Sequence, residues 1–291
     1  MIPEFDFRVY RSEEKPKPFR DYLYFDNLII KRGKLGGFCP ICGATTLFEL
    51  QAPIVREDLS CRNCRSFNRI RQLMIGLAWA RGVKIKFNTN LRDIFATFKS
   101  PTRILLLEAV TPIAAMFEYY AAQSKKVELY KTEYISGSLK SGEQKEDIMH
   151  FDILKSGFDD EFFDIIVHAD VFEHVSDAPR AEREQYRLLK KNGFAIYTAP
   201  TKDELNNDDI RTRLHKDGSL NKIKSAIYHG DPAPSDLGEA GSIVFRFFSY
   251  NDIRKRYLAL GADYSCLKIY APGFGIIGQN NHVHYVKKPK K

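Results

Sequence analysis

Four of the five cysteines stand in two closely spaced pairs. Cys39 and Cys42 form the first pair, and Cys61 and Cys64 form the second, with 18 residues between the pairs. A Cys-x-x-Cys turn directs two thiolates at one ion, and a hairpin between two such turns brings all four together. The spacing therefore predicts a structural Zn²⁺ site, since four thiolates leave no open coordination position. Four reduced, buried thiols without a metal are the alternative.

Four arginines lie within or soon after the second cysteine pair: Arg62, Arg65, Arg69 and Arg71. Beside a zinc module, such arginines could hold the phosphates of RNA. Apolar residues recur at helical spacing over 66–81, however, so the arginines are more simply the solvent-facing side of one amphipathic helix. A third interpretation places Arg69 or Arg71 in a functional site, facing an anionic group.

Carboxylates form a second group of residues able to do chemistry, and they lie where predicted strands end. Short apolar strands are expected at 103–107, 127–131 and 162–168. The acids that follow these strands are Glu108, Glu133 and Asp170. Parallel strands place their carboxyl ends at one edge of the sheet, where ligands bind. We therefore expect these acids to line one site, with a loop or capping role as the alternative for each.

Three histidines are candidate general bases, because an imidazole titrates near neutral pH. His174 follows Asp170 in the same loop. His229 stands in a long irregular segment, two residues before Asp231, which could orient its ring. His168 lies at a strand end and is expected to point into the sheet. A solvated loop histidine is the alternative for the other two.

The elements that must position these residues follow from periodicity. From about residue 102 onward, strands alternate with helices, which predicts a mainly parallel sheet covered on both faces. The helices are expected at 112–123, 179–189 and 250–260, and two closing strands at 264–270 and 281–286. Cys266, in the first closing strand, is expected to be a core residue.

We expect three segments along the chain. Residues 1–37 form an irregular extension, residues 38–82 the cysteine module with its helix, and residues 83–291 an α/β domain. Within that domain, residues 201–248 fit no regular strand–helix unit and form an insertion, with a short helix expected inside it. An insertion of this length is usually functional.

Composition limits the class of protein. The 291 residues are 44% hydrophobic, and no apolar run is long enough to cross a membrane. The first residues lack the apolar segment of a secretory signal, so we expect a cytoplasmic protein. The net charge of +8 permits an anionic partner such as RNA or a phosphorylated glycan. A solvated surface with the basic tail 287–291 explains the same charge.

Residues 147–200 resemble the second half of the class I S-adenosylmethionine-dependent methyltransferase domain. Three motifs carry the resemblance: Phe-Phe-Asp-Ile-Ile-Val at 162–167, Asp-Val-Phe-Glu-His-Val at 170–175, and Leu-Leu-Lys-Lys-Asn-Gly at 188–193. A subgroup with a Cys-x-x-Cys preface is similar also at 132–134 and 226–232. The resemblance implies a Rossmann-like sheet of seven strands, mostly parallel with one antiparallel, and a small N-terminal zinc-ribbon module.

The resemblance also implies where S-adenosylmethionine binds. Glu133 would hold the ribose hydroxyls, Asp152 and Ile153 the adenine, and Asp170 and Val171 would lie near the methionine end. The remaining residues expected at the cofactor are Glu108, Ala109, Thr111 and Tyr134. The sequence departs from the family's pattern in the loop after the first expected strand, 103–107. This loop reads Glu-Ala-Val-Thr-Pro at 108–112 and lacks the usual glycines, which leaves less space for the cofactor.

The function expected from the resemblance is O-methylation of a glycan or other small molecule. His174 and His229, with Asp231, are the residues expected to act in catalysis. An RNA methyltransferase that holds RNA through its zinc ribbon and arginines is one alternative. A non-catalytic scaffold or regulator with a methyltransferase fold is the other.

Overall fold

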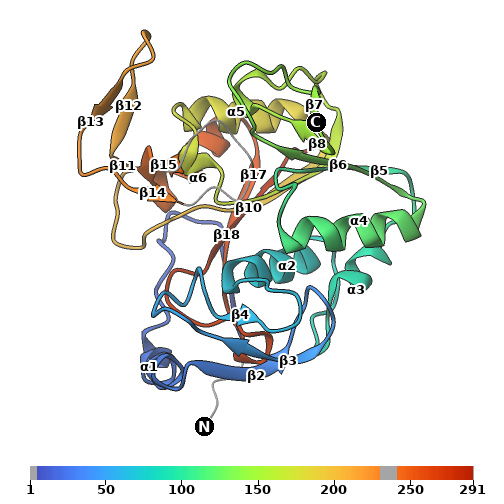
Figure 1. Cartoon of the computed structure of the whole chain (residues 1–291), viewed down its shortest axis with the longest axis vertical. Helices are drawn as coiled ribbons and strands as arrows, with labels where there is room; N and C mark the ends of the chain where they lie inside the picture. Colours follow the sequence, from blue (N-terminus) through green and yellow to red (C-terminus); the bar gives the residue numbers. More distant parts are fainter. Residues whose placement is uncertain (1–4, 230–240, 291) are drawn as a thin grey trace.

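The computed structural model describes residues 5–229 and 241–290. Its centre is a nine-stranded sheet in the order β1-β17-β18-β10-β9-β5-β6-β8-β7 (Figure 1). The strands of this sheet are β1 (Asp6–Tyr10), β5 (Thr102–Leu106), β6 (Val127–Glu133), β7 (Gln144–Lys145), β8 (Ile148–His150), β9 (Phe163–Ala169), β10 (Leu189–Thr198), β17 (Asp263–Tyr270) and β18 (His282–Lys287).

The sheet is mostly parallel, as expected. Strands β8, β6, β5, β9 and β10 run in one direction. Strand β18 runs against its neighbours β10 and β17. The expected count of seven strands was too low, because β1 and β7 add an antiparallel strand at each edge.

Helices cover both faces of the sheet (Figure 1). On one face lie α2 (Asn68–Ala80), α3 (Leu91–Phe95) and α4 (Pro112–Ser124), and on the other lie α5 (Ala178–Leu188) and α6 (Tyr250–Ala259). Side chains alternate along each strand, so the sheet has a core on each face. Ile104 and Leu106 belong to the first core, and Leu105 and Leu107 belong to the second. Cys266 is buried in the second core, as predicted.

The N-terminal segment is not the irregular extension that was expected. It contains β1, helix α1 (Leu23–Arg32) and strand β2 (Lys34–Phe38). Strand β1 pairs with β17, and Ile29 of α1 is buried in the first core. These short elements are stabilised by partners far along the chain, which local periodicity does not reveal.

The cysteine module is a three-stranded antiparallel sheet of β2, β3 (Thr45–Glu49) and β4 (Ser60–Cys61). It packs closely on the C-terminal turn η4 (Pro272–Phe274). A Cβ atom on Gly37 would lie 2.4 Å from the Gly273 carbonyl oxygen, and one on Gly275, where φ is +67°, would lie 2.5 Å from the Phe48 ring. The backbones of Gly37 and Gly273 therefore pack directly together, and the Phe48 ring packs on Gly275.

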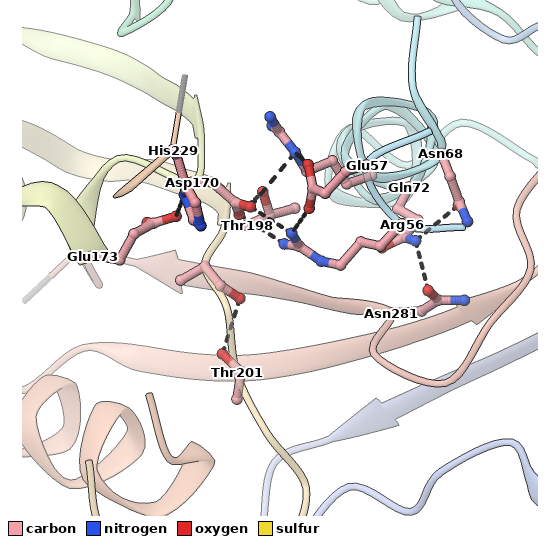
Figure 2. A network of polar contacts seen from close by, with 12 residues as sticks. Arg56, Glu57, Asn68, Gln72, Asp170, Glu173, Thr198, Thr201, His229 and Asn281 are labelled. Atoms are coloured by element: carbon pink, nitrogen blue, oxygen red, sulfur yellow. Dashed lines mark hydrogen bonds and ion pairs between the residues drawn. The ribbon is translucent and has the colours of Figure 1, made fainter. Parts of the chain in front are cut away.

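Helix α2 is buried almost all round, since the sheet lies on one side and the cysteine module on the other (Figure 1). Its polar residues find partners inside the protein. Asn68 donates to the Ile277 carbonyl at 2.6 Å, and Gln72 donates to the Asn281 side chain at 2.7 Å (Figure 2).

Arg71 corrects the interpretation of the arginines as a solvent-facing row. It is fully buried over the Phe48 ring, 4.2 Å from the ring centroid. Its guanidinium donates to four backbone carbonyl groups, from two segments about 200 residues apart: those of Leu59, Ser66, Phe274 and Gly275. Arg71 thus joins the second cysteine loop to the C-terminal turn.

The described parts of the insertion, 201–229 and 241–248, contain short antiparallel pairs and no helix, so the expected short helix was wrong there. The pairs are β11 (Asp209–Ile210) with β16 (Arg246–Phe247), β12 (Thr212–Leu214) with β13 (Leu220–Lys222), and β14 (Tyr228–His229) with β15 (Ser242–Ile243). No helix of the described residues is long and apolar enough to span a membrane.

The fold predicts that Arg71→Met is severely destabilising. The methionine fills part of the space but leaves the four carbonyl groups without donors, at a cost of about 3 to 5 kcal/mol in the free energy of unfolding. Urea denaturation measures this loss. The control is Arg62→Met, since the Arg62 side chain is 66% exposed, and it should change stability by less than about 0.5 kcal/mol. Equal effects of the two substitutions would contradict the role given to Arg71.

Candidate functional site

The carboxyl ends of β5, β6 and β9 bring Glu108, Glu133 and Asp170 to one edge of the sheet, as the parallel arrangement predicts. The Ala109 N–H donates to Glu133 Oε2 at 3.2 Å, so the carboxylate after β6 is bonded to the loop after β5. Thr111 lies at the N-cap of α4, but its hydroxyl donates to Glu108 Oε2 at 2.7 Å instead of capping the helix.

Glu108 is a buried carboxyl at this edge. Burial raises its pKa from 4.5 to about 7, although the Arg69 guanidinium and the Thr111 hydroxyl act in the opposite direction. The glycine-less loop is thus occupied by a bonded side-chain pair, Glu108 and Thr111.

Three more expected cofactor residues lie after β6 and β8. Asp152 caps the short helix η2 (Ile153–Lys155), with its Oδ1 accepting the Leu154 N–H at 2.8 Å. Ile153 is buried in the second core. The ring of Tyr134 lies beside that of His150, with 5.3 Å between ring centroids. For Asp152, the capping role that was the alternative is therefore present.

Asp170 is held by several side chains of the site (Figure 2). Its backbone is left-handed, with φ at +54°, and its carboxylate is almost fully buried. Both oxygens are held by Arg56, one of them at 2.7 Å, and the Thr198 hydroxyl donates at 2.8 Å. Arg69 stands 3.5 Å away. Burial opposes ionisation, but Arg56 and Arg69 outweigh it and hold the pKa of Asp170 well below its usual range.

Arg56 and Glu57 were not predicted as site residues. They lie in the loop between the two cysteine pairs. Glu57 forms an ion pair with Arg56 (Figure 2) and another with Arg69. No motif marks them, because their role depends on how the cysteine module packs against the end of β9. Arg69, in contrast, fulfils the third interpretation of the arginines, since it faces the site.

The Asp170 loop and the insertion together form a histidine pair. The Phe245 N–H donates to the Glu173 carbonyl at 2.7 Å, which attaches the insertion to the loop. Nδ1 of His174 lies 2.8 Å from the Ile243 carbonyl, and Nε2 of His174 lies 3.2 Å from Nδ1 of His229. The two predicted histidines therefore meet, although 55 residues separate them. Asp231 lies outside the described residues.

Glu173 lies directly against this pair, and Figure 2 shows it beside His229. Its side chain is fully buried, with Oε1 3.7 Å from His174 Nε2 and 4.0 Å from His229 Nδ1. His168 does not join the cluster. It is buried in the sheet, as expected, with Nε2 2.9 Å from Gln185 Oε1, and burial lowers its pKa to about 3.

The four paired cysteines converge on one point. Their Sγ atoms all lie within 4.8 Å of one another, with 3.7 Å between Cys39 and Cys64 and 4.0 Å between Cys42 and Cys61. A zinc–sulfur distance of about 2.3 Å in a tetrahedron corresponds to about 3.8 Å between sulfurs. The donor set and its spacing therefore fit Zn²⁺.

The buried Arg71 charge supports the same conclusion. Burial lowers the pKa of Arg71 to about 10, and the four nearby cysteines act in the opposite direction. A Zn²⁺ ion with four thiolates carries a net negative charge, which a neighbouring guanidinium offsets.

Of the four arginines that could have held RNA, Arg71 and Arg69 are engaged internally, and only Arg62 and Arg65 are exposed.

We expect one equivalent of zinc to be lost from Cys42→Ser, because three thiolates and a hydroxyl hold the ion more weakly than four thiolates. Metal analysis of the purified protein checks this, together with the melting temperature, which should fall when the metal is removed. Cys266→Ala is the matched control and should keep its zinc, since Cys266 lies in the other core. A chain that melts unchanged without zinc would refute a structural metal.

Glu108 should make stability depend on pH. The pKa of its carboxyl group is about 7 in the folded chain, against the ordinary value of 4.5 in an unfolded chain. Between these two pH values, the folded chain keeps a proton that the unfolded chain loses. The contribution of this group to the free energy of unfolding therefore falls as the pH rises from about 4.5 to 7. Glu108→Gln removes that slope and should gain up to about 3 kcal/mol on wild type across this range. Urea denaturation at several pH values tests it, with the exposed Glu118→Gln as control; parallel curves for Glu108→Gln and wild type would contradict it.

Comparison with known proteins gives a family match for part of the chain. Residues 111–197 match the family model described as a methyltransferase domain. The matched segment runs from the N-cap of α4 to near the end of β10, and so contains Glu133, Asp152 and Asp170. No curated protein sequence matches the chain.

Several solved structures are similar at low identity. The 1,6-didemethyltoxoflavin-N1-methyltransferase of Burkholderia thailandensis is 11% identical with a TM-score of 0.36, over 73% of this chain and 78% of that chain. The CurJ carbon methyltransferase is 12% identical with a TM-score of 0.39, over 68% and 53%. The YcgJ protein of Bacillus subtilis is 15% identical with a TM-score of 0.32, over 65% and 70%. With the α/β fold, the family match over 111–197 supports a class I S-adenosylmethionine-dependent methyltransferase.

Proposed function

We propose that this protein transfers a methyl group from S-adenosylmethionine to a hydroxyl oxygen of a glycan or other small molecule. One observation carries the proposal: acids after three parallel strands share an edge with a histidine pair that a long insertion completes. The acids are suited to binding a nucleoside cofactor, and the histidine pair is suited to an acceptor that must lose a proton.

The cofactor half of the site would be built around Glu133. Its carboxylate can accept hydrogen bonds from both ribose hydroxyls, and the Ala109 N–H already fixes its orientation. Tyr134, Asp152 and Ile153 would hold the adenine from the ends of the next strands. The bound cofactor supplies an activated methyl group on a positively charged sulfur, so the protein's task is alignment.

Arg69 is the candidate for the cofactor's carboxylate. It lies 3.5 Å from Asp170, and its charge acts on Glu108, so it stands between the loop after β5 and the loop after β9. In this proposal, Arg69 supplies the anion-binding group that a glycine-rich loop otherwise provides through its backbone. Asp170 and Val171 would then lie beside the methionine chain.

The acceptor half would be the histidine pair. Nδ1 of His174 lies on a carbonyl oxygen and must carry a proton, so Nε2 of His174 is the basic nitrogen. Burial lowers the pKa of His229, which favours the neutral ring at neutral pH. In the proposed role, this pair takes up the acceptor's proton, with Asp231 as a further orienting group.

Cofactor binding is the first test. Glu133→Gln should weaken S-adenosylmethionine binding about ten- to a hundredfold, because hydrogen bonds to a charged acceptor are worth about 1.5 to 3 kcal/mol. Isothermal titration calorimetry measures the effect. Glu128→Gln is the matched control, since Glu128 lies on the same strand with a 57% exposed side chain, and it should bind as wild type. If wild type gives no heat at millimolar cofactor, the chain is a non-catalytic scaffold and the proposal fails.

The acceptor is tested with methyl-labelled cofactor and fractionated cell extract. Label should appear on a hydroxylated small molecule or glycan as a methyl ether, which resists mild alkali, whereas a methyl ester does not. Label on RNA would replace this proposal by the RNA methyltransferase alternative.

A further inference from the structure

Glu173, His174 and His229 converge more closely than a proton-accepting pair requires. One nitrogen of each ring and one oxygen of the carboxylate lie within 4.8 Å of one another. The three separations are 3.2 Å between the rings, and 3.7 and 4.0 Å from Glu173 Oε1 to His174 Nε2 and His229 Nδ1. For ligands about 2.1 Å from one ion, angles of about 90 to 180° correspond to separations of about 3.0 to 4.2 Å. All three separations fall in this range.

Glu173 supplies independent support. Its side chain is fully buried, and both carboxylate oxygens have no hydrogen-bond partner among the described residues. The nearby arginines are bonded to Asp170 and Glu57. A buried carboxylate without partners is costly, and in proteins such groups are paired or bind a metal. Its Oε1 faces the two imidazole nitrogens, so an ion held between them would give this carboxylate a partner.

The orientation of His174 fits the same conclusion. Its Nδ1 lies 2.8 Å from the Ile243 carbonyl, so that N–H is bonded and the lone pair on Nε2 is directed at the cluster. A metal-binding histidine almost always donates its second N–H to a carbonyl or carboxylate, which fixes the tautomer and the ring. The insertion thus contributes His229 from β14 and the support for His174 from β15.

We propose that Glu173, His174 and His229 bind one divalent transition-metal ion at the acceptor side of the site, and that its open positions take oxygen atoms of a hydroxylated acceptor. Two imidazoles and one carboxylate suit Zn²⁺, Mn²⁺, Fe²⁺ or Co²⁺ better than Mg²⁺ or Ca²⁺, which prefer oxygen ligands throughout. Three protein ligands leave coordination positions open, unlike the four cysteines.

This inference rests on the proposed O-methylation and changes one part of it. The acceptor hydroxyl would bind the ion, which lowers its pKa, and its proton would pass to water instead of remaining on an imidazole. The acceptor oxygen then forms the new O–CH₃ bond. The S–CH₃ bond of the cofactor breaks, and its electron pair stays on sulfur.

Cobalt titration of the metal-free full-length protein tests the site. Co²⁺ bound by the cysteines gives a thiolate charge-transfer absorption, whereas Co²⁺ bound by nitrogen and oxygen ligands gives only the weaker d–d bands. Wild type should bind two equivalents, one of each type. Glu173→Gln and His229→Ala should keep the thiolate-bound equivalent and lose the other, with affinity reduced more than tenfold.

The matched control is His215→Ala, since His215 is exposed in the β12–β13 hairpin, and it should bind both equivalents. The thiolate band also shows that each variant is folded. A wild type that binds only the thiolate-type equivalent at millimolar Co²⁺, or variants that still bind two with unchanged affinity, would overturn the proposal. Because no cofactor is present in this titration, a failure to bind S-adenosylmethionine would refute the proposed function and leave the metal result standing.

Discussion

The ion pairs of Asp170 with Arg56 and Arg69 are the interaction on which the arrangement of the site depends. Asp170 directly follows β9, Arg56 comes from the loop between the cysteine pairs, and Arg69 comes from α2. Removing one member of such a buried group leaves an uncompensated charge, which is far more costly than losing a surface pair. The cysteine module, the helix beneath it and the sheet are therefore coupled at one point, and that point is also where the cofactor's methionine end is proposed to lie.

This coupling gives the cysteine module a role in the site. The module's packing on η4 and α2 sets the position of the loop that carries Arg56 and Glu57. Glu57 in turn bridges the two arginines. A zinc ion that orders the module would thus act on the site through ion pairs and not through contact with substrate.

The regular elements of the α/β domain could be predicted from the sequence because they are specified locally. Apolar runs and capping residues place β5, α4, β9 and α6 to within one or two residues of their observed ends. β1 and α1 could not be predicted in this way, since β1 is held by β17, some 250 residues away. For the same reason Arg71 was assigned to solvent: its partners Phe274 and Gly275 are invisible to helical periodicity.

The residues of the candidate site show the same difference between features specified locally and features that depend on distant partners. Glu108, Glu133 and Asp170 could be predicted because the ends of parallel strands meet at one edge. His174 and His229 were each chosen for their chemistry, but their contact depends on how β15 pairs with β14 and on the Phe245 bond to Glu173. Glu173 was present in the motif and was passed over, because nothing in the sequence shows that its carboxylate is buried with no hydrogen-bond partner among the residues that the structure describes.

Arg71 donates to carbonyl groups about 200 residues further along the chain, and this separation has a consequence for the order in which the chain can fold. Helix α2 and the cysteine loops are synthesised about 200 residues before their partners in η4 and at Asn281. Contacts of such large sequence separation form late. Until that later segment is synthesised, the Arg71 guanidinium and the Gln72 amide lack these partners, so the packing of α2 and the cysteine module is completed late. A chain truncated shortly before residue 270 would therefore also lack the groups that hold α2 and the cysteine module in place.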